Sequence, residues 1–137
     1  MSPDWRRQGR LSAVIERVRG RSAGFVGARM DVAASAVWLY WHREVPPEAA
    51  ERARAEADGG VVVELRTTPY ALDELTAEAA RVLRTCPAAV SAGPNRDYDG
   101  LRIGVNASET PLDAVRVESR MPVELMARGR IIPIRRG

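Results

Sequence analysis

In the stretch Val61–Val82 the spacing of apolar residues changes from a period of two to a period near 3.6. This change predicts a strand followed by a helix, and the other predicted elements lie before and after this pair. Apolar side chains first alternate with polar ones over residues 61–66, which is typical of a half-buried strand. Pro69 ends this strand, because proline has no N–H for the ladder and fixes its own φ. Apolar residues then recur at a period near 3.6, which predicts an amphipathic helix over Leu72–Leu83. The residues expected on its solvated face are Asp73, Glu74, Glu78 and Arg81.

Other segments carry similar signals of helices, strands and turns. A capping serine and a first-turn proline predict a helix start at Ser2-Pro3-Asp4, and Gly20 is placed to end that helix. The Asp99-Gly100 pair before an alternating segment indicates a hairpin. The further predicted elements are strands Phe25–Asp31 and Ala36–His42 (a hairpin), helix Glu48–Asp58, strands Ala89–Ala92 and Leu101–Val105, a short helix Thr110–Arg116 and strand Pro122–Met126.

The order of these elements predicts an α+β fold. We expect a two-layer sandwich with a mainly antiparallel sheet and helices on one face. The last six elements form a β-α-β-β-α-β series, the ferredoxin-like pattern, in the C-terminal two-thirds of the chain. The predicted organisation is a basic N-terminal helix over residues 1–21, one α+β domain over residues 22–126 and a tail over residues 127–137. The predicted core residues are Val61, Val63, Leu65, Leu72, Leu75, Leu83, Ile103 and Val105.

Charge is unevenly distributed along the 137 residues. All 21 basic residues are arginine. Residues 1–21 and 120–137 each carry a net charge of +4, so the middle of the chain carries −5. The basic ends either fold back on the acidic body or meet an acidic partner, such as nucleic acid or a protein surface. Without an aromatic-studded basic stripe, nucleic acid is the less favoured partner.

Few residues offer catalytic or metal chemistry. His42 is the only histidine and is expected at a strand end in solvent, and Cys86, the only cysteine, is expected to be buried and inert. Residues 95–100 match the first half of a calcium loop, but Asn106 stands where the closing glutamate would be, so we favour a hairpin. No nucleophile elbow or phosphate-binding loop is present. We therefore expect no enzymatic activity, bound metal or cofactor.

No run of apolar residues approaches the length of a membrane span, so we expect none. The N-terminal segment has arginines but no continuous apolar core, and so does not resemble a signal peptide. The sequence as written predicts a cytoplasmic protein, or one that has lost its leader.

Five segments together resemble the N-terminal pro-regions of secreted bacterial chymotrypsin-like proteases, of the alpha-lytic protease and streptogrisin type. They are GFVGARMDV, VWLYW, VPPEAAERA, VVVELRTTPYALDELTAEAARVL and AVSAGPNRDYDGLRIGV, spread over about residues 24–126. The resemblance implies a non-enzymatic folding assistant and inhibitor whose sheet pairs with a protease hairpin and whose tail lies in the active-site cleft. No protease domain follows Gly137, so we expect any cognate protease to be bound in trans, or the module to be reused for another protein.

The predicted partner-binding surface is a sheet edge together with the tail, Ala127–Gly137. Three large aliphatic residues lie between arginines, and Pro133 favours an extended conformation before it. The candidate binding residues are Arg130, Ile131, Ile132, Pro133, Ile134, Arg135 and Arg136. The alternatives are that the tail packs on its own body or frays. A second class of function also stays open, a structural or assembly subunit of a virion or other particle. The expected partner is another protein or further copies of this chain.

Overall fold

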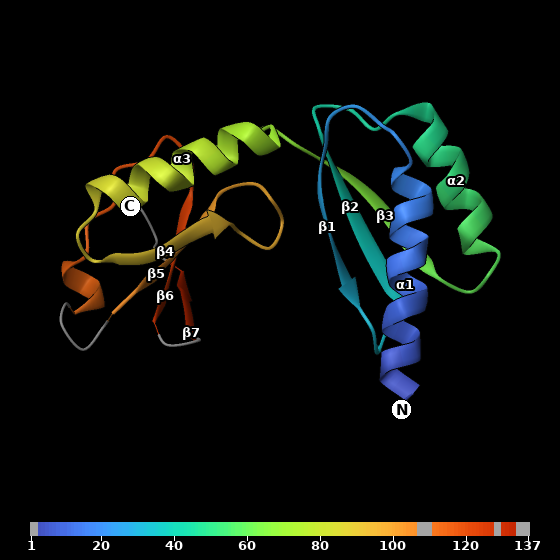
Figure 1. Ribbon diagram of the computed structural model, residues 1–137, viewed down its shortest axis with the longest axis horizontal. Helices are drawn as coiled ribbons and strands as arrows, with labels where there is room; N and C mark the ends of the chain where they lie inside the picture. The colour runs from blue at the N-terminus through green and yellow to red at the C-terminus, as the bar shows by residue number, and fades with distance from the viewer. Residues whose placement is uncertain (1–2, 107–110, 128–129, 134–137) are drawn as a thin grey trace. The chain divides into compact units, whose positions relative to one another are not determined.

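The computed structural model describes residues 3–106, 111–127 and 130–133, with side chains for residues 5–106 and 111–127. The chain divides into two compact units, Met1–Leu72 (unit 1) and Asp73–Gly137 (unit 2). Each ladder of paired strands lies within one of these units (Figure 1). The segment 22–126, predicted from sequence as one domain, is thus shared between the two.

Unit 1 contains two helices and a three-stranded sheet among its described residues. Its elements are α1 (Pro3–Arg19), β1 (Phe25–Asp31), β2 (Ala36–His42), α2 (Pro47–Ala57) and β3 (Val62–Thr68). The sheet order is β1-β2-β3, with β1 and β2 antiparallel and β2 and β3 parallel. A parallel pair needs a long crossover connection, and α2 supplies it. The predicted first hairpin is confirmed with its bounds.

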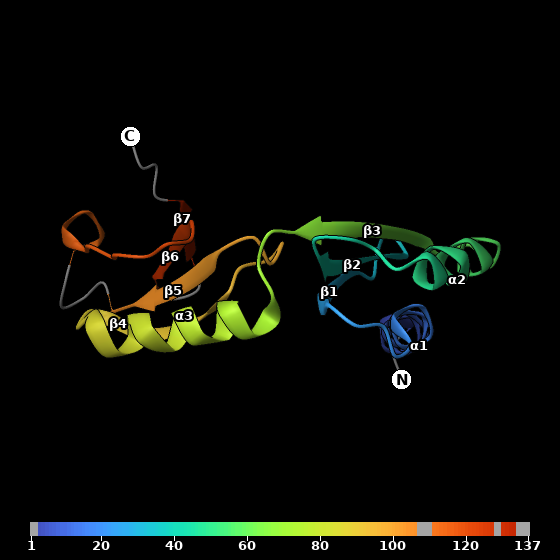
Figure 2. The ribbon, with the colours of Figure 1, turned by 90° about the horizontal axis from the view of Figure 1, so that it is seen from above.

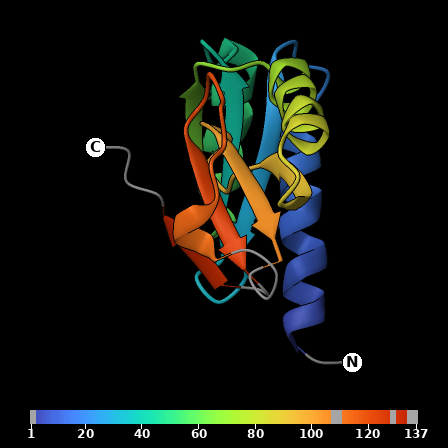
Figure 3. The ribbon, with the colours of Figure 1, turned by 90° about the vertical axis from the view of Figure 1, so that its left-hand side faces the viewer.

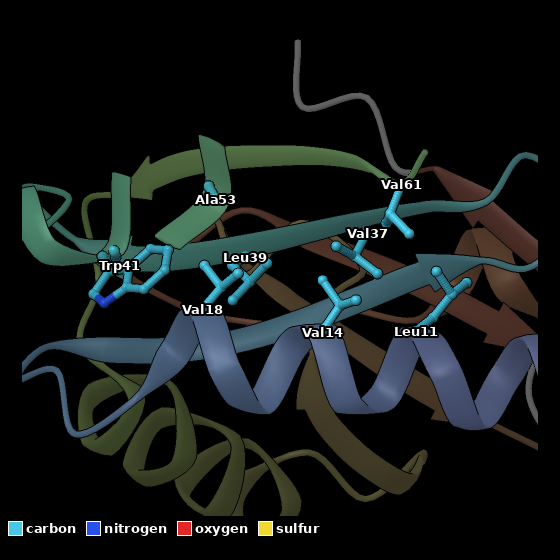
Figure 4. Packing of buried hydrophobic residues seen from close by; sticks show 9 residues of the cluster. Leu11, Val14, Val18, Val37, Leu39, Trp41, Ala53 and Val61 are labelled. Carbon is cyan, nitrogen blue, oxygen red and sulfur yellow. The ribbon is translucent and has the colours of Figure 1, made fainter. Parts of the chain in front are cut away.

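Both helices of unit 1 pack on the same face of this sheet. Val37, Leu39 and Trp41 alternate along β2 and are fully buried. They form one core cluster with α1 and α2, whose contributions recur at helical spacing. Figure 4 shows part of this cluster, with α1 lying below β2. The helix residues in it are Leu11, Val14, Val18, Ala49 and Ala53.

Unit 2 contains one α-helix and a four-stranded sheet among its described residues. Its elements are α3 (Leu72–Thr85), β4 (Ala89–Pro94), β5 (Leu101–Val105), the 3₁₀ turn η1 (Leu112–Ala114), β6 (Val123–Ala127) and β7 (Arg130–Pro133). The sheet order is β4-β5-β6-β7, in which only β5 and β6 are parallel. Helix α3 lies along one side of this sheet (Figures 2 and 3). The predicted β4–β5 hairpin is confirmed.

Three side chains of α3 differ from the predicted helix faces. Leu72 and Leu83 are 45 % and 42 % exposed, so they are not core residues. Glu78, predicted on the solvated face, is only 2 % exposed. Its spacing from Leu75 and Val82, which are fully buried, is three and four residues, and this places it on the apolar face. The other predicted core residues are buried or half-buried.

The α+β class is confirmed, but the predicted sheet is not. Two small mixed sheets replace one mainly antiparallel sheet. The ferredoxin-like order is not confirmed, because the elements expected to share one sheet are divided between the two units. The predicted short helix is reduced to η1, and the tail adds β7, a strand that the sequence pattern did not predict.

The two units repeat one order of elements: a helix, an antiparallel hairpin, a crossover and a strand parallel to the second hairpin strand. Equivalent residues in the hairpins are 64 positions apart. Phe25 pairs with Trp41 in unit 1, and Ala89 pairs with Val105 in unit 2; in both units the register then shifts before the next pair. The buried positions of α1 and α3 repeat at the same spacing, as in the pairs Leu11 and Leu75, and Val18 and Val82.

The repeat continues into the third strand. Val63 pairs with Val37, and Val123 pairs with Leu101, which lies 64 positions after Val37. The tripeptide that begins at Val63 is Val-Glu-Leu, and so is the one that begins at Val123. Measured between these paired residues, the crossover is four residues shorter in unit 2, and it contains η1 where unit 1 has α2. Strand β3 is therefore the counterpart of β6.

Candidate functional site

The predicted binding tail is partly built into a sheet. Residues 130–133 form β7, which pairs antiparallel with β6, with Ile131 opposite Met126 and Ile132 opposite Leu125. The backbone of this segment therefore packs on its own unit. The side chains of residues 130–133 lie outside the described part of the structure, as do Ile134, Arg135 and Arg136. Within the described residues, the strand that pairs with the tail is β6.

A polar and aromatic cluster occupies the side of the unit 1 sheet opposite α1 and α2, here called the Trp38 face. The guanidinium carbon of Arg29 lies 4.0 Å from the Trp38 ring centroid, a cation–π distance. Arg29 Nε also donates to the Tyr40 hydroxyl at 3.0 Å. Trp38 Nε1 donates to Glu64 Oε2 at 2.8 Å. These contacts tie β1, β2 and β3 together on that face.

The carboxylate of Glu64, on β3, accepts hydrogen bonds from two side chains of this cluster. Arg66 Nη2 donates to its Oε2 at 2.8 Å, on the same strand two residues along. The hydrogen bond from Arg66, and then that from Trp38, lower the pKa of Glu64 below its ordinary value. The carboxylate is therefore charged at neutral pH. Strand β3 presents a negative and a positive side chain side by side.

Strand β3 is an end strand of its sheet among the described residues, so its backbone has an outer edge. The amide of Val62 donates to Ser35 O, and Arg43 N donates to Thr68 O. Because backbone groups alternate in direction along a strand, even-numbered residues of β3 bond towards β2. The N–H and C=O groups of Val63, Leu65 and Thr67 therefore point away from β2. Val62, at the start of the strand, is 52 % exposed.

The other strands at the ends of the sheets carry features that hinder pairing with a further strand. Strands β1 and β4 each have an irregular register, which twists an edge away from a neighbour. Strand β4 also ends in Gly93-Pro94, and β7 ends in Pro133. Strand β3 has no glycine, proline or bulge over seven consecutive pairs with β2. Among the described strands, β3 offers the longest regular edge.

A hollow of about 640 Å³ lies in unit 1 where α1 ends and α2 begins. Its lining includes His42, Glu44, Glu48 and Arg52. Arg52 Nε donates to Val18 O at 3.1 Å, so its guanidinium caps the carboxyl end of α1. The hollow mixes acidic and basic groups, and it does not present the uniform charge that would select one ligand. His42 lies at the strand end as predicted, but it is half-buried where it was expected in solvent.

The buried carboxylate of Glu78 is the second polar cluster. It accepts hydrogen bonds from Arg81 Nε at 2.6 Å, Ser119 Oγ at 2.8 Å and the backbone N of Arg120 at 3.0 Å. The Arg81 hydrogen bond is the largest influence, and together these donors lower the pKa of Glu78 to about 2 against the opposing effect of burial. These hydrogen bonds fix the segment after η1 to α3, and the low pKa makes the Glu78 carboxylate a weak base.

The remaining candidate groups have structural surroundings. Asn95 is buried, donates to Asp99 Oδ1 at 2.8 Å and accepts from the Asp99 amide at 3.0 Å, so the calcium-like loop is held as a hairpin turn. Cys86 is buried, with its thiol 3.7 Å from Arg116 O. Within the described residues no three His, Cys, Asp or Glu side chains gather as a metal site would require. No helix in that part of the chain is long and apolar enough to cross a bilayer.

A sheet edge was expected from the sequence to bind the partner, but that edge was not assigned to β3, because one larger sheet was expected and the order of its strands was not predicted. The signal of β3 was present as an unbroken alternating segment without glycine or proline. In comparisons with known proteins, no family model, curated protein or solved structure matched this chain.

Proposed function

We propose that this chain is a non-enzymatic protein-binding module that takes a strand of its partner onto the outer edge of β3. The observation that carries the proposal is the regular seven-residue edge of β3, whose backbone groups at Val63, Leu65 and Thr67 point away from the sheet. Strand addition obtains its affinity from main-chain hydrogen bonds and its specificity from the alternate side chains. Glu64 and Arg66 would supply that specificity on the Trp38 face.

The resemblance to protease pro-regions supports the same class of function. In such proteins a sheet pairs with a strand of the bound protease, and no catalysis by the pro-region is needed. The partner is then a protein with an accessible extended segment. The alternative, an assembly subunit, would use the same edge to build a larger particle.

A proline scan of two edges tests the proposal. Thr67→Pro removes an N–H that points away from β2, so it should block an added strand and keep the fold. Ala92→Pro is the matched control on β4. The amide of Asn95 donates to Gly100 O, so by alternation the N–H of Ala92 also points outward.

Each chain serves as immobilised bait for an extract of the native host, with bound proteins identified by mass spectrometry. Proteins held by the wild type and by Ala92→Pro should be lost with Thr67→Pro. The same set on all three baits, or no specific protein on any, would contradict the proposal.

A further inference from the structure

The side chains of β3 are complementary to a second β3 running in the opposite direction. When two such strands are aligned with Leu65 opposite Leu65 of the second copy, Val63 lies opposite Thr67. Glu64 then lies opposite Arg66, and this happens twice, once on each side of the centre. Opposite charges directly across an antiparallel pair stabilise it, whereas like charges destabilise it.

The backbone supports the same register. In an antiparallel pair, hydrogen-bonded and non-hydrogen-bonded positions alternate. Leu65, Val63 and Thr67 carry the outward N–H and C=O groups, so they occupy the hydrogen-bonded positions. Glu64 and Arg66 then occupy the other positions, where opposing side chains are closest. Faces also match, because residues opposite each other in the register have the same parity.

The repeat within the chain provides an independent precedent. Strand β6 is the counterpart of β3, and an antiparallel strand, β7, covers its outer edge. Glu124 and Leu125, within the paired part of β6, correspond to Glu64 and Leu65. An edge of this sequence and geometry therefore accepts an antiparallel neighbour in unit 2. In unit 1, β3 is the end of its sheet.

We infer that the β3 edge binds the β3 edge of a second copy of this chain, in an antiparallel register centred on Leu65. The result is a two-fold dimer in which the three-stranded sheets of both copies join into one continuous sheet. Such an isologous contact closes on itself, so it yields a dimer and no filament. The inference rests on the proposed function and names the partner at the same edge.

Charge exchange across the two-fold axis tests the register. Glu64→Arg places two arginines opposite each other at both pairs, and Arg66→Glu places two glutamates together. The double variant Glu64→Arg/Arg66→Glu restores both opposite pairs with the charges exchanged. The molar mass of each protein is measured by light scattering and by sedimentation equilibrium over a range of concentrations. Circular dichroism melting monitors the fold of each variant.

The wild type should have twice the chain mass of 15.0 kDa, each single variant one chain mass and the double variant twice the chain mass again. Thr67→Pro should be monomeric and Ala92→Pro dimeric, which keeps the test decisive if an arginine or glutamate variant unfolds. A wild type that is monomeric up to its highest soluble concentration would overturn the inference. So would a dimer that persists in both single variants and in Thr67→Pro, or a double variant that stays monomeric.

These outcomes also separate the inference from the proposed function. A monomeric wild type that captures another protein through Thr67-sensitive binding would overturn the self-pairing and leave the strand-binding function standing. A monomeric wild type that captures nothing would overturn both. A large closed oligomer would overturn the two-fold pair and favour the assembly function.

Discussion

At the scale of single residues, Glu78 departs furthest from its prediction. A glutamate on a helix with charged neighbours is normally solvated, and the local pattern offers no reason to assign it otherwise. Hydrogen bonds from Ser119 and Arg120, more than 40 residues away along the chain, offset the cost of burying its carboxylate. That pairing depends on tertiary structure and cannot be predicted from local pattern. In unit 1 the equivalent position holds the buried Val14, which needs no polar partner.

Glu78→Gln should destabilise the fold at neutral pH, because it removes the charge from a buried set of hydrogen bonds. The expected loss in the free energy of unfolding is about 1–3 kcal/mol. The folded-state pKa is about 2, below the ordinary value of 4.5. The stabilisation from this carboxylate is therefore full above about pH 4.5 and is lost as pH falls towards 2.

Denaturant unfolding of the wild type and the variant between pH 7 and pH 2 checks this prediction. The difference between the two proteins should shrink over the lower part of that range. The exposed Glu51 provides the control, and Glu51→Gln should change stability little at any pH. A difference for Glu78→Gln that stays constant down to pH 2 would contradict the assigned pKa.

At the scale of elements, the sequence predicted most helices and strands and both hairpins, but not the pairing of strands that are distant in the chain. The first hairpin was predicted because only four residues join its strands, and the second because Asp99-Gly100 precedes an alternating segment. In the structure, the Asp31 carboxylate accepts a hydrogen bond from the Ala34 amide in the first turn. The division into two sheets depends on which distant strands pair. Local periodicity does not predict that pairing. Strand β7 was missed because the tail offers only four paired residues, and its partner β6 determines their conformation.

Two leucine-to-alanine variants test which side chains of α3 are buried. Leu75→Ala should cost about 2–5 kcal/mol of stability, because Leu75 is fully buried and its removal leaves a cavity. Leu83→Ala, the same change on the same helix, should cost less than about 1 kcal/mol because that side chain is 42 % exposed. Chemical denaturation of both variants measures the difference. Equal costs would mean that the apolar face of α3 is assigned wrongly.

At the scale of the whole molecule, the two units share one order of elements but differ, among the described residues, in whether the third strand has an outer neighbour. In unit 2 the edge of β6 is occupied by β7, and in unit 1 the equivalent edge of β3 is the end of the sheet. The sequence predicted a sheet edge as part of the binding surface, but it could not assign that edge to β3, because alternation indicates a strand and not its position in a sheet. The other part of the predicted surface, the tail, supplies the strand that covers β6.

Residue-resolved hydrogen exchange of β3, followed by NMR as the protein concentration is raised, tests the pairing of this edge most directly. The amides of Glu64, Arg66 and Thr68 bond towards β2 and should be protected at every concentration. The amides of Val63, Leu65 and Thr67 should exchange rapidly in dilute protein and become protected together as the dimer forms. Rapid exchange of these three amides at all concentrations would contradict the pairing.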